Sequence, residues 1–134
     1  MRMKRLLAAA LAALTLLCAA GCGGYESHYS AVGFVHSNEA KSAFMEYYTF
    51  EGRMVFRLRA DGTECLVCDA GLEAGSVSVT CVSGGEESVI LTVSGGDGIT
   101  VMGDPLPRGT VYILVDSPEK SMNGSFHFTL EKQT

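Results

Sequence analysis

The chain has 134 residues, enough for one small domain, and its formal net charge is −5. Its 16 glycines, 3 prolines and lack of tryptophan exclude a collagen-like or proline-rich linker protein, and the acidic balance argues against a nucleic-acid-binding protein. The sequence holds no nucleophile elbow, no Walker loop and no dinucleotide-binding glycine pattern in a strand–helix setting. We therefore expect a non-enzymatic protein with no cofactor.

The N-terminus has the pattern of a bacterial secretory signal. A basic segment (residues 2–5) precedes an apolar run (residues 6–17) that is too short for a stable transmembrane helix. Small residues then lead to Cys22, and this ending resembles a lipobox. The resemblance implies that Cys22 becomes the first mature residue and carries a diacylglyceryl group, whose acyl chains anchor the protein in the membrane. A secreted protein cleaved at Ala20 or Gly21 and a retained transmembrane anchor are the alternatives.

We expect a lipoprotein signal peptide over residues 1–21, a flexible tether over 22–29 and a β-sandwich domain over 30–134. Cleavage removes three basic residues and no acidic ones, which leaves seven basic and fifteen acidic residues and a net charge of −8. Such a chain is repelled from anionic lipid and should stand off the membrane. The charge serves solubility in the simplest interpretation, and the alternative is a preference for cationic partners such as divalent metals or basic peptides.

The remainder of the chain alternates between apolar and polar residues with the period of a β-strand. In chain order the expected strands cover residues 41–48 (a helix being the alternative), 53–59, 76–80, 89–93, 111–115 and 126–131. Two of them, 89–93 and 111–115, are apolar on both faces and are predicted to be central. Turn signals recur at Asp61-Gly62, Ala74-Gly75, Gly84-Gly85, Gly95-Gly96, Asp97-Gly98, Arg108-Gly109 and Asn123-Gly124. This spacing predicts an all-β, antiparallel β-sandwich or jelly roll of about seven to nine strands.

Three segments carry a family resemblance. They are TFEGRMVFRL at 49–58, LPRGTVYILVD at 106–116 and NGSFHFTL at 123–130. With His36-Ser37-Asn38 and the lipobox, they resemble small lipoproteins of low-GC Gram-positive bacteria, which have no assigned activity. A second, architectural likeness is to bacterial pre-peptidase C-terminal domains, which implies a β-sandwich in an accessory rather than catalytic role.

Three cysteines lie outside the anchor: Cys65, Cys68 and Cys81. Cys65 and Cys68 have the CxxC spacing of redox and zinc sites, but they lie in a strand pattern, where residues three apart point to opposite faces. A hairpin turn centred on Glu73 would set Cys65 opposite Cys81 and permit a disulfide. The alternative is that these cysteines are buried free thiols.

Other candidate groups are scattered along the chain, and no metal site is expected. His28, His36 and His127 have no ligand spacing. Four aspartates (61, 97, 104 and 116) near strand ends are expected to cap turns, with calcium binding as the alternative. Tyr25, Tyr29, Tyr47 and Tyr48 could stack on sugars or pack on neighbours, and one of the adjacent pair should face outward. Arg53, Arg57 and Arg59 share a strand face that is either paired with local acids or able to bind a carboxylate or phosphate.

The sequence therefore predicts a monomeric, lipid-anchored β-sandwich on the outer side of the bacterial cytoplasmic membrane, with no nucleic-acid partner. Its ligand is an unknown envelope protein or glycan. A binding module predicts an exposed aromatic or apolar patch on one sheet or at one loop end. The runner-up, an inhibitor that protects the envelope from a lytic enzyme, predicts a protruding polar loop. A metal protein or enzyme predicts a deep pocket with converging His and Asp.

Overall fold

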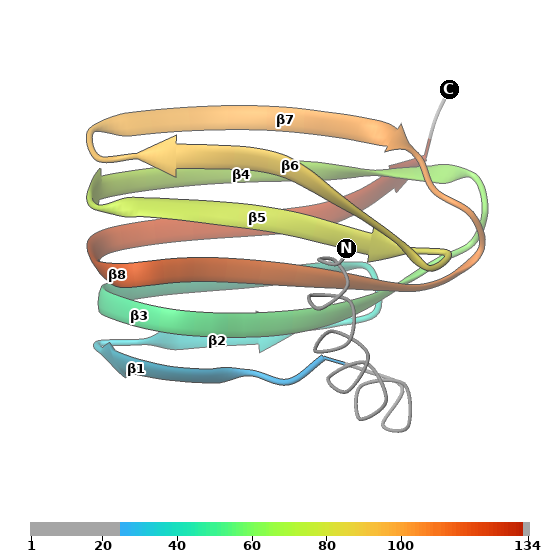
Figure 1. Cartoon of the computed structure of the whole chain (residues 1–134). Helices are drawn as coiled ribbons and strands as arrows, with labels where there is room; N and C mark the ends of the chain where they lie inside the picture. Colours follow the sequence, from blue (N-terminus) through green and yellow to red (C-terminus); the bar gives the residue numbers. More distant parts are fainter. Residues whose placement is uncertain (1–24, 133–134) are drawn as a thin grey trace, which may run out of the picture.

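The computed structural model describes residues 25–132, and this part of the chain is built from strands and short connections (Figure 1). The predicted signal peptide and Cys22 lie outside the described residues. Among those that are described, no helix is long and apolar enough to cross a membrane. The strands are β1 (His28–Val32), β2 (Val35–Asn38), β3 (Ser42–Ala60), β4 (Glu64–Ala74), β5 (Ser76–Ser83), β6 (Glu86–Ser94), β7 (Asp97–Pro105) and β8 (Gly109–Lys132).

Two long strands, β3 and β8, organise the fold because each takes part in both layers. The first half of β3 and the second half of β8 pair with each other, with β2 on one side and β4 and β7 on the other; we call this layer the A sheet. The remaining halves pair with β1, β5 and β6 to form the B sheet. All pairs are antiparallel, and the two layers face each other (Figure 1). The predicted antiparallel β-sandwich is confirmed.

The core lies between the two sheets and follows from the alternation of the strands. In β3, the side chains of Met45, Phe56 and Leu58 point inward, and at most 2% of each is exposed. Phe126 and Phe128 of β8 meet them from the neighbouring strand, and the rings of Phe56 and Phe128 are 5.8 Å apart. Each such side chain contributes about 1.5–3 kcal/mol through burial. The inward faces of β3 and β8 thus supply the centre of the core to both sheets.

The bend in β3 falls at Gly52, where the pairing with β8 shifts register. Gly52 has a φ of +119°, and a Cβ built there would lie 2.5 Å from the carbonyl oxygen of His28. Beneath the bend, the hydroxyls of Tyr47 and Ser121 are 2.7 Å apart, and Ser117 donates to the carbonyl of Glu119 at 2.5 Å. These buried hydroxyls satisfy polar groups where the strand ladder is interrupted.

The predicted boundary between tether and domain needs correction. β1 begins at His28, and residues from Tyr25 onward already contact the sandwich. The Tyr25 hydroxyl donates to Glu87 at 3.0 Å, and the backbone N–H of Val55 donates to Ser27 Oγ at 2.8 Å. Residues 25–29, expected in the flexible tether, therefore belong to the folded domain.

Two details of the strand prediction are wrong. Residues 89–93 lie in β6, which pairs only with β5 among the described strands, so this is an edge strand rather than a central one. Asp97-Gly98 begins β7, and Asn123-Gly124 lies inside β8, so neither dipeptide makes a turn. Residues 111–115 do form the centre of the B sheet, and residues 42–48 of the segment predicted at 41–48 are extended.

Candidate binding surface

The outer face of the A sheet carries a row of side chains that crosses five strands. Cross-strand register aligns Ser37 of β2, Phe44 of β3, His127 of β8, Asp69 of β4 and Thr100 of β7. The rings of Phe44 and His127 are stacked, with centroids 5.5 Å apart and an interplanar angle of 14°. At the far end of the row, Thr100 Oγ1 donates to Asp69 Oδ1 at 2.9 Å. A ring pair and a carboxylate therefore stand side by side on an open sheet.

The neighbouring row combines one carboxylate with small residues. Register aligns Val35, Glu46, Ser125, Gly71 and Gly98. His127 Nε2 lies 3.3 Å from Glu46 Oε2, and half of each side chain is exposed. A Cβ built on Gly71 or Gly98 would meet nothing closer than 3.8 Å, so only backbone lies at this part of the surface. The small residues make a flat strip beside the stacked rings.

A third row of side chains borders the flat strip on the side away from the Phe44–His127 stack. Tyr48 is 52% exposed on β3, whereas its neighbour Tyr47 is 5% exposed in the core. This confirms that one of the adjacent tyrosines faces outward. Asn123 Nδ2 donates to Glu73 Oε1 at the same level of the sheet. The face thus offers two aromatic positions, Tyr48 and the Phe44–His127 stack, on either side of the flat strip.

The outer face of the B sheet is occupied by the N-terminal segment. The ring of Tyr25 packs edge-on against that of Tyr112 of β8, with centroids 5.2 Å apart. Burial, and then the hydrogen bond to Glu87, raise the pKa of the Tyr25 hydroxyl. The guanidinium of Arg57 lies over the same Tyr112 ring at 5.6 Å. Residues 25–27 therefore dock on the B sheet.

The three arginines of β3 lie on this same B face. Arg53 makes a bidentate pair with Asp116, with N–O distances of 2.6 and 3.1 Å. The hydrogen bond to Asp116 raises the pKa of Arg53. Of the two interpretations of this arginine face, Arg53 therefore follows the first: it is paired with a local acid. The B face thus carries acids, Asp116 and Glu87, beside its arginines, and the A face carries the acidic side chains Glu46, Asp69, Glu73 and Glu131.

The cysteines do not have the geometry that a Cys65–Cys81 disulfide requires. β4 and β5 do not pair; Gly75 alone separates them, and the chain passes there from one sheet to the other. Cys65, Cys68 and Cys81 are free and buried. Cys68 and Cys81 belong to the core between the sheets, whereas Cys65 is buried outside that cluster. The hairpin register that placed Cys65 opposite Cys81 is therefore wrong.

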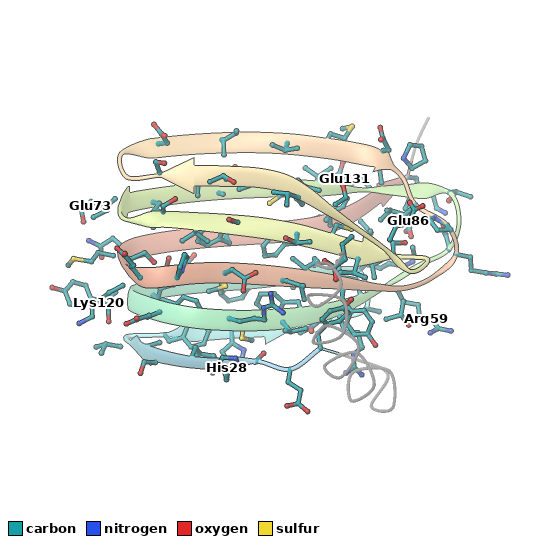
Figure 2. The ribbon with its side chains drawn as sticks, viewed as in Figure 1. His28, Arg59, Glu73, Glu86, Lys120 and Glu131 are labelled. Carbon is teal, nitrogen blue, oxygen red and sulfur yellow. The ribbon has the colours of Figure 1, made fainter. Side chains whose placement is uncertain are left out.

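The histidines and aspartates are spread over the sandwich. His28 lies on β1 at one edge (Figure 2), His36 on β2 and His127 on β8. Asp61 Oδ1 accepts from the Thr63 backbone N–H at 2.8 Å and caps the β3–β4 turn, as predicted. Between residues 25 and 132, no three His, Cys, Asp or Glu side chains gather in a way that could hold a metal ion.

The connections between strands are short. Each one within residues 28–132 has at most three residues. None of these connections is the protruding polar loop that the inhibitor alternative predicts, but residues 118–120 inside β8 are exposed and bulge opposite the single residue Glu51. The exposed aromatic patch that a binding module would need is present on the A sheet. The sequence did not reveal Phe44, Glu46, Asp69 and Thr100 as one surface, because only the register of four strand pairs brings them together.

Neither family models nor curated proteins match the sequence. Similar solved structures include PliG of Aeromonas hydrophila, a periplasmic inhibitor of g-type lysozyme, at 15% identity and a TM-score of 0.48, over 69% of this chain and 88% of that one. Another is TmCBM61 in complex with β-1,4-galactotriose, at 12% identity and a TM-score of 0.46, over 80% and 88%. The Drosophila melanogaster CENP-C cupin domain follows at 17% and 0.33, over 79% and 76%. Likenesses this distant carry no argument about function.

Proposed function

We propose that this protein is a non-catalytic glycan-binding lipoprotein on the outer side of the bacterial cytoplasmic membrane, anchored through Cys22. Its binding surface is the outer face of the A sheet. The observation that carries the proposal is the Phe44–His127 stack, in which His127 is half exposed and Phe44 is partly buried, beside the flat strip of Ser125, Gly71 and Gly98.

The chemistry of this face suits a sugar chain. The C–H faces of pyranose rings pack on aromatic rings, and sugar hydroxyls donate to carboxylates. The stack and Tyr48 supply the rings, and Glu46 and Asp69 supply the acceptors. Because the face is acidic, the favoured glycan is neutral or carries amino groups, and polyanionic polymers are repelled.

The N-terminal segment supports an orientation in which this face is accessible. Cys22 stands only three residues before Tyr25. Three residues reach at most about 11 Å. An acyl group on Cys22 therefore stays close to the B sheet, where Tyr25 is docked and Arg57 and Arg59 are found. Arginines on that side are attracted to anionic headgroups, and the acidic A face points away from the membrane.

The direct test measures binding to chitotetraose, a soluble neutral amino-sugar chain, and to purified cell-wall sacculi. Replacement of the stack in Phe44→Ala/His127→Ala should weaken binding about fivefold or more, because a ring contact is worth about 0.5–1.5 kcal/mol beyond its buried area. Isothermal titration and co-sedimentation provide the measurements.

The matched control is Val89→Ala, which removes an exposed apolar side chain from the outer face of the B sheet. It should leave binding unchanged. Equal loss of binding in both variants, or no binding of either glycan by the wild-type protein, would remove the A face from consideration as a glycan surface.

A further inference from the structure

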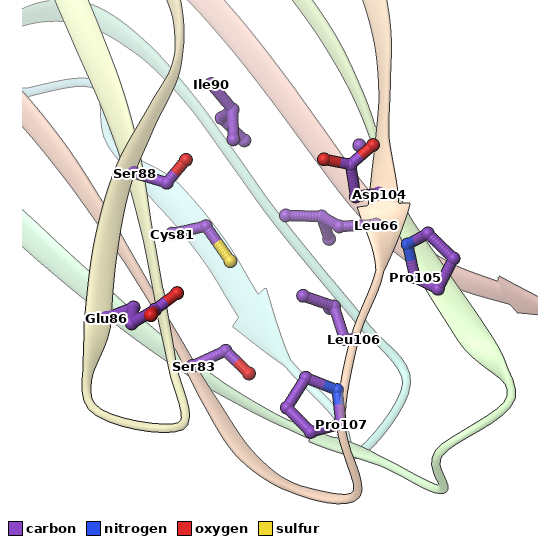
Figure 3. Close-up of a pocket in the computed structure, with 11 residues that line it drawn as sticks. Leu66, Cys81, Ser83, Glu86, Ser88, Ile90, Asp104, Pro105, Leu106 and Pro107 are labelled. Atoms are coloured by element: carbon purple, nitrogen blue, oxygen red, sulfur yellow. The ribbon is translucent and has the colours of Figure 1, made fainter.

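A second feature lies at the open edge of the sandwich, between β6 and β7. A cavity of about 200 Å³ opens there (Figure 3). Its floor is apolar and is formed by Leu66, Cys81, Ile90 and Leu106. This cavity is on neither of the two outer faces, so the proposed glycan surface does not use it.

Two β-bulges, one on each flanking strand, form the walls of this cavity. In β6, Ile90 is the extra residue between the pairs Val79–Leu91 and Thr80–Val89. In β7, Gly103 and Asp104 stand opposite the single residue Leu66 of β4. All of the extra residues line the cavity. Bulges redirect side chains and are concentrated at binding sites, so two bulges that face each other across one cavity are the local cause of its shape.

Two carboxylates stand beside this cavity. Figure 3 shows Glu86 on the β6 side and Asp104 on the β7 side. Neither carboxylate takes part in an ion pair or hydrogen bond with residues 25–132. Arg108, the basic residue closest to Asp104 in sequence, has its Cβ beside Gly62 of the β3–β4 turn. Deeper in the cavity, the Cys81 side chain is 6% exposed and lacks a hydrogen-bond partner among the same residues.

We propose that this cavity binds a lysine side chain of a partner protein. The four methylene groups of lysine would lie along Leu66, Ile90 and Leu106, where they bury apolar area. The ammonium group would donate to one of the two unpaired carboxylates, Glu86 or Asp104, and the other would add to the negative charge around the cavity. The net charge of the chain without its signal, −8, favours the approach of a basic segment.

Size and position favour a side chain of a protein over a free small molecule. Pockets for drug-sized ligands have volumes of about 300–1,000 Å³, which exceeds this cavity. Among the described strands, β6 pairs only with β5, and β7 pairs only with β4, so both keep a free edge beside the mouth. A segment that inserts a lysine here can form backbone hydrogen bonds with one of these edges.

The test compares two peptides that differ in one charge, acetyl-Gly-Lys-Gly-amide and acetyl-Gly-norleucine-Gly-amide. Methyl NMR of the wild-type protein should show saturable shifts at Leu66, Ile90 and Leu106 with the lysine peptide. The double variant Glu86→Gln/Asp104→Asn should weaken this binding at least about tenfold, because hydrogen bonds to charged groups are the strong ones.

The matched control is Asp97→Asn, which removes an exposed carboxylate at the other end of β7 and should not change binding. Equal affinity for the norleucine peptide, or undiminished affinity in the double variant, overturns the proposal. Binding of n-pentylamine as tight as that of the lysine peptide also overturns it, because a free amine would then be the occupant. The methyl group of Thr100 on the A face should not shift, so this result is separate from that of the glycan test.

Discussion

Cys68 shows how the sandwich controls the chemistry of a single side chain. Burial, and then the negative charge of Asp69, raise the pKa of the Cys68 thiol to about 12. Burial also raises the pKa of Cys81. Because their pKa values are raised, both thiols are protonated at neutral pH and behave as small apolar groups. The thiolate is the reactive form of cysteine, so these side chains should react slowly.

A thiol-labelling experiment tests this property. In the native protein at pH 8, a maleimide should modify Cys68 and Cys81 at least about a hundredfold more slowly than in urea, since the thiolate is rare in the fold and the side chains are inaccessible. Peptide mass mapping gives the rate at each cysteine. Rapid native labelling, or a Cys65–Cys81 crosslink after mild oxidation, would contradict the arrangement described above.

At this scale the sequence was informative wherever a residue acts alone. The opposed directions of Cys65 and Cys68 and the turn-capping role of Asp61 follow from strand alternation and local hydrogen bonding, and the structure shows both. Pairings between distant strands could not be predicted, because nothing local indicates that β4 and β5 lie in different sheets. Because strand pairing could not be predicted, a Cys65–Cys81 disulfide was suggested and the row of side chains on the A face was missed.

Among the elements, β3 depends most on one position, because its bend leads from one sheet into the other. Gly52 has a left-handed backbone, and the carbonyl of His28 occupies the space that a side chain would need. Gly85 offers a comparison, since its φ is +81° and a Cβ there would meet nothing within 4 Å.

We expect Gly52→Ala to lower the free energy of unfolding by about 3 kcal/mol or more, from backbone strain and the clash together. Gly85→Ala carries only the conformational cost, about 1–2 kcal/mol. Urea unfolding followed by circular dichroism measures both. If Gly52→Ala were no more destabilising than Gly85→Ala, the bend would not require the close approach of β1.

The elements themselves were partly predictable. Alternation identified the strand segments, since burying one face of a sheet requires it. The lengths of β3 and β8 were missed: Asn123-Gly124 has the composition of a turn, but Asn123 adopts a φ of +51° within a continuing strand. The apolar run 89–93 was placed at the centre of a sheet, yet Val89 is 65% exposed on an edge strand. Composition alone therefore does not distinguish an edge strand from a central one.

On the scale of the whole molecule, the docking of Tyr25 predicts which way the protein faces. Val89 on the B face and Met102 on the A face are 65% and 63% exposed, so they form a matched pair. Each can be replaced by cysteine and labelled with a fluorophore, since the native cysteines are buried.

In the acylated protein on vesicles that contain a headgroup-linked quencher, the label at position 89 should be quenched more strongly than the label at 102. A glycine–serine insert of about 15 residues before Tyr25 should remove the difference, because it lengthens the reach from about 11 Å to several tens of ångströms. Equal quenching without the insert would show that the tether, rather than the docked segment, sets the orientation.

The position of β8 affects how this protein can be made. Among the described strands β8 is the last to be synthesised, and it pairs with β3, β4 and β5 across the two layers. Contacts so far apart in sequence close slowly, and none of them can form while β8 is still inside the ribosome. Until β8 is added, β3, β4 and β5 lack the strand that joins them, so the core between the two sheets cannot close.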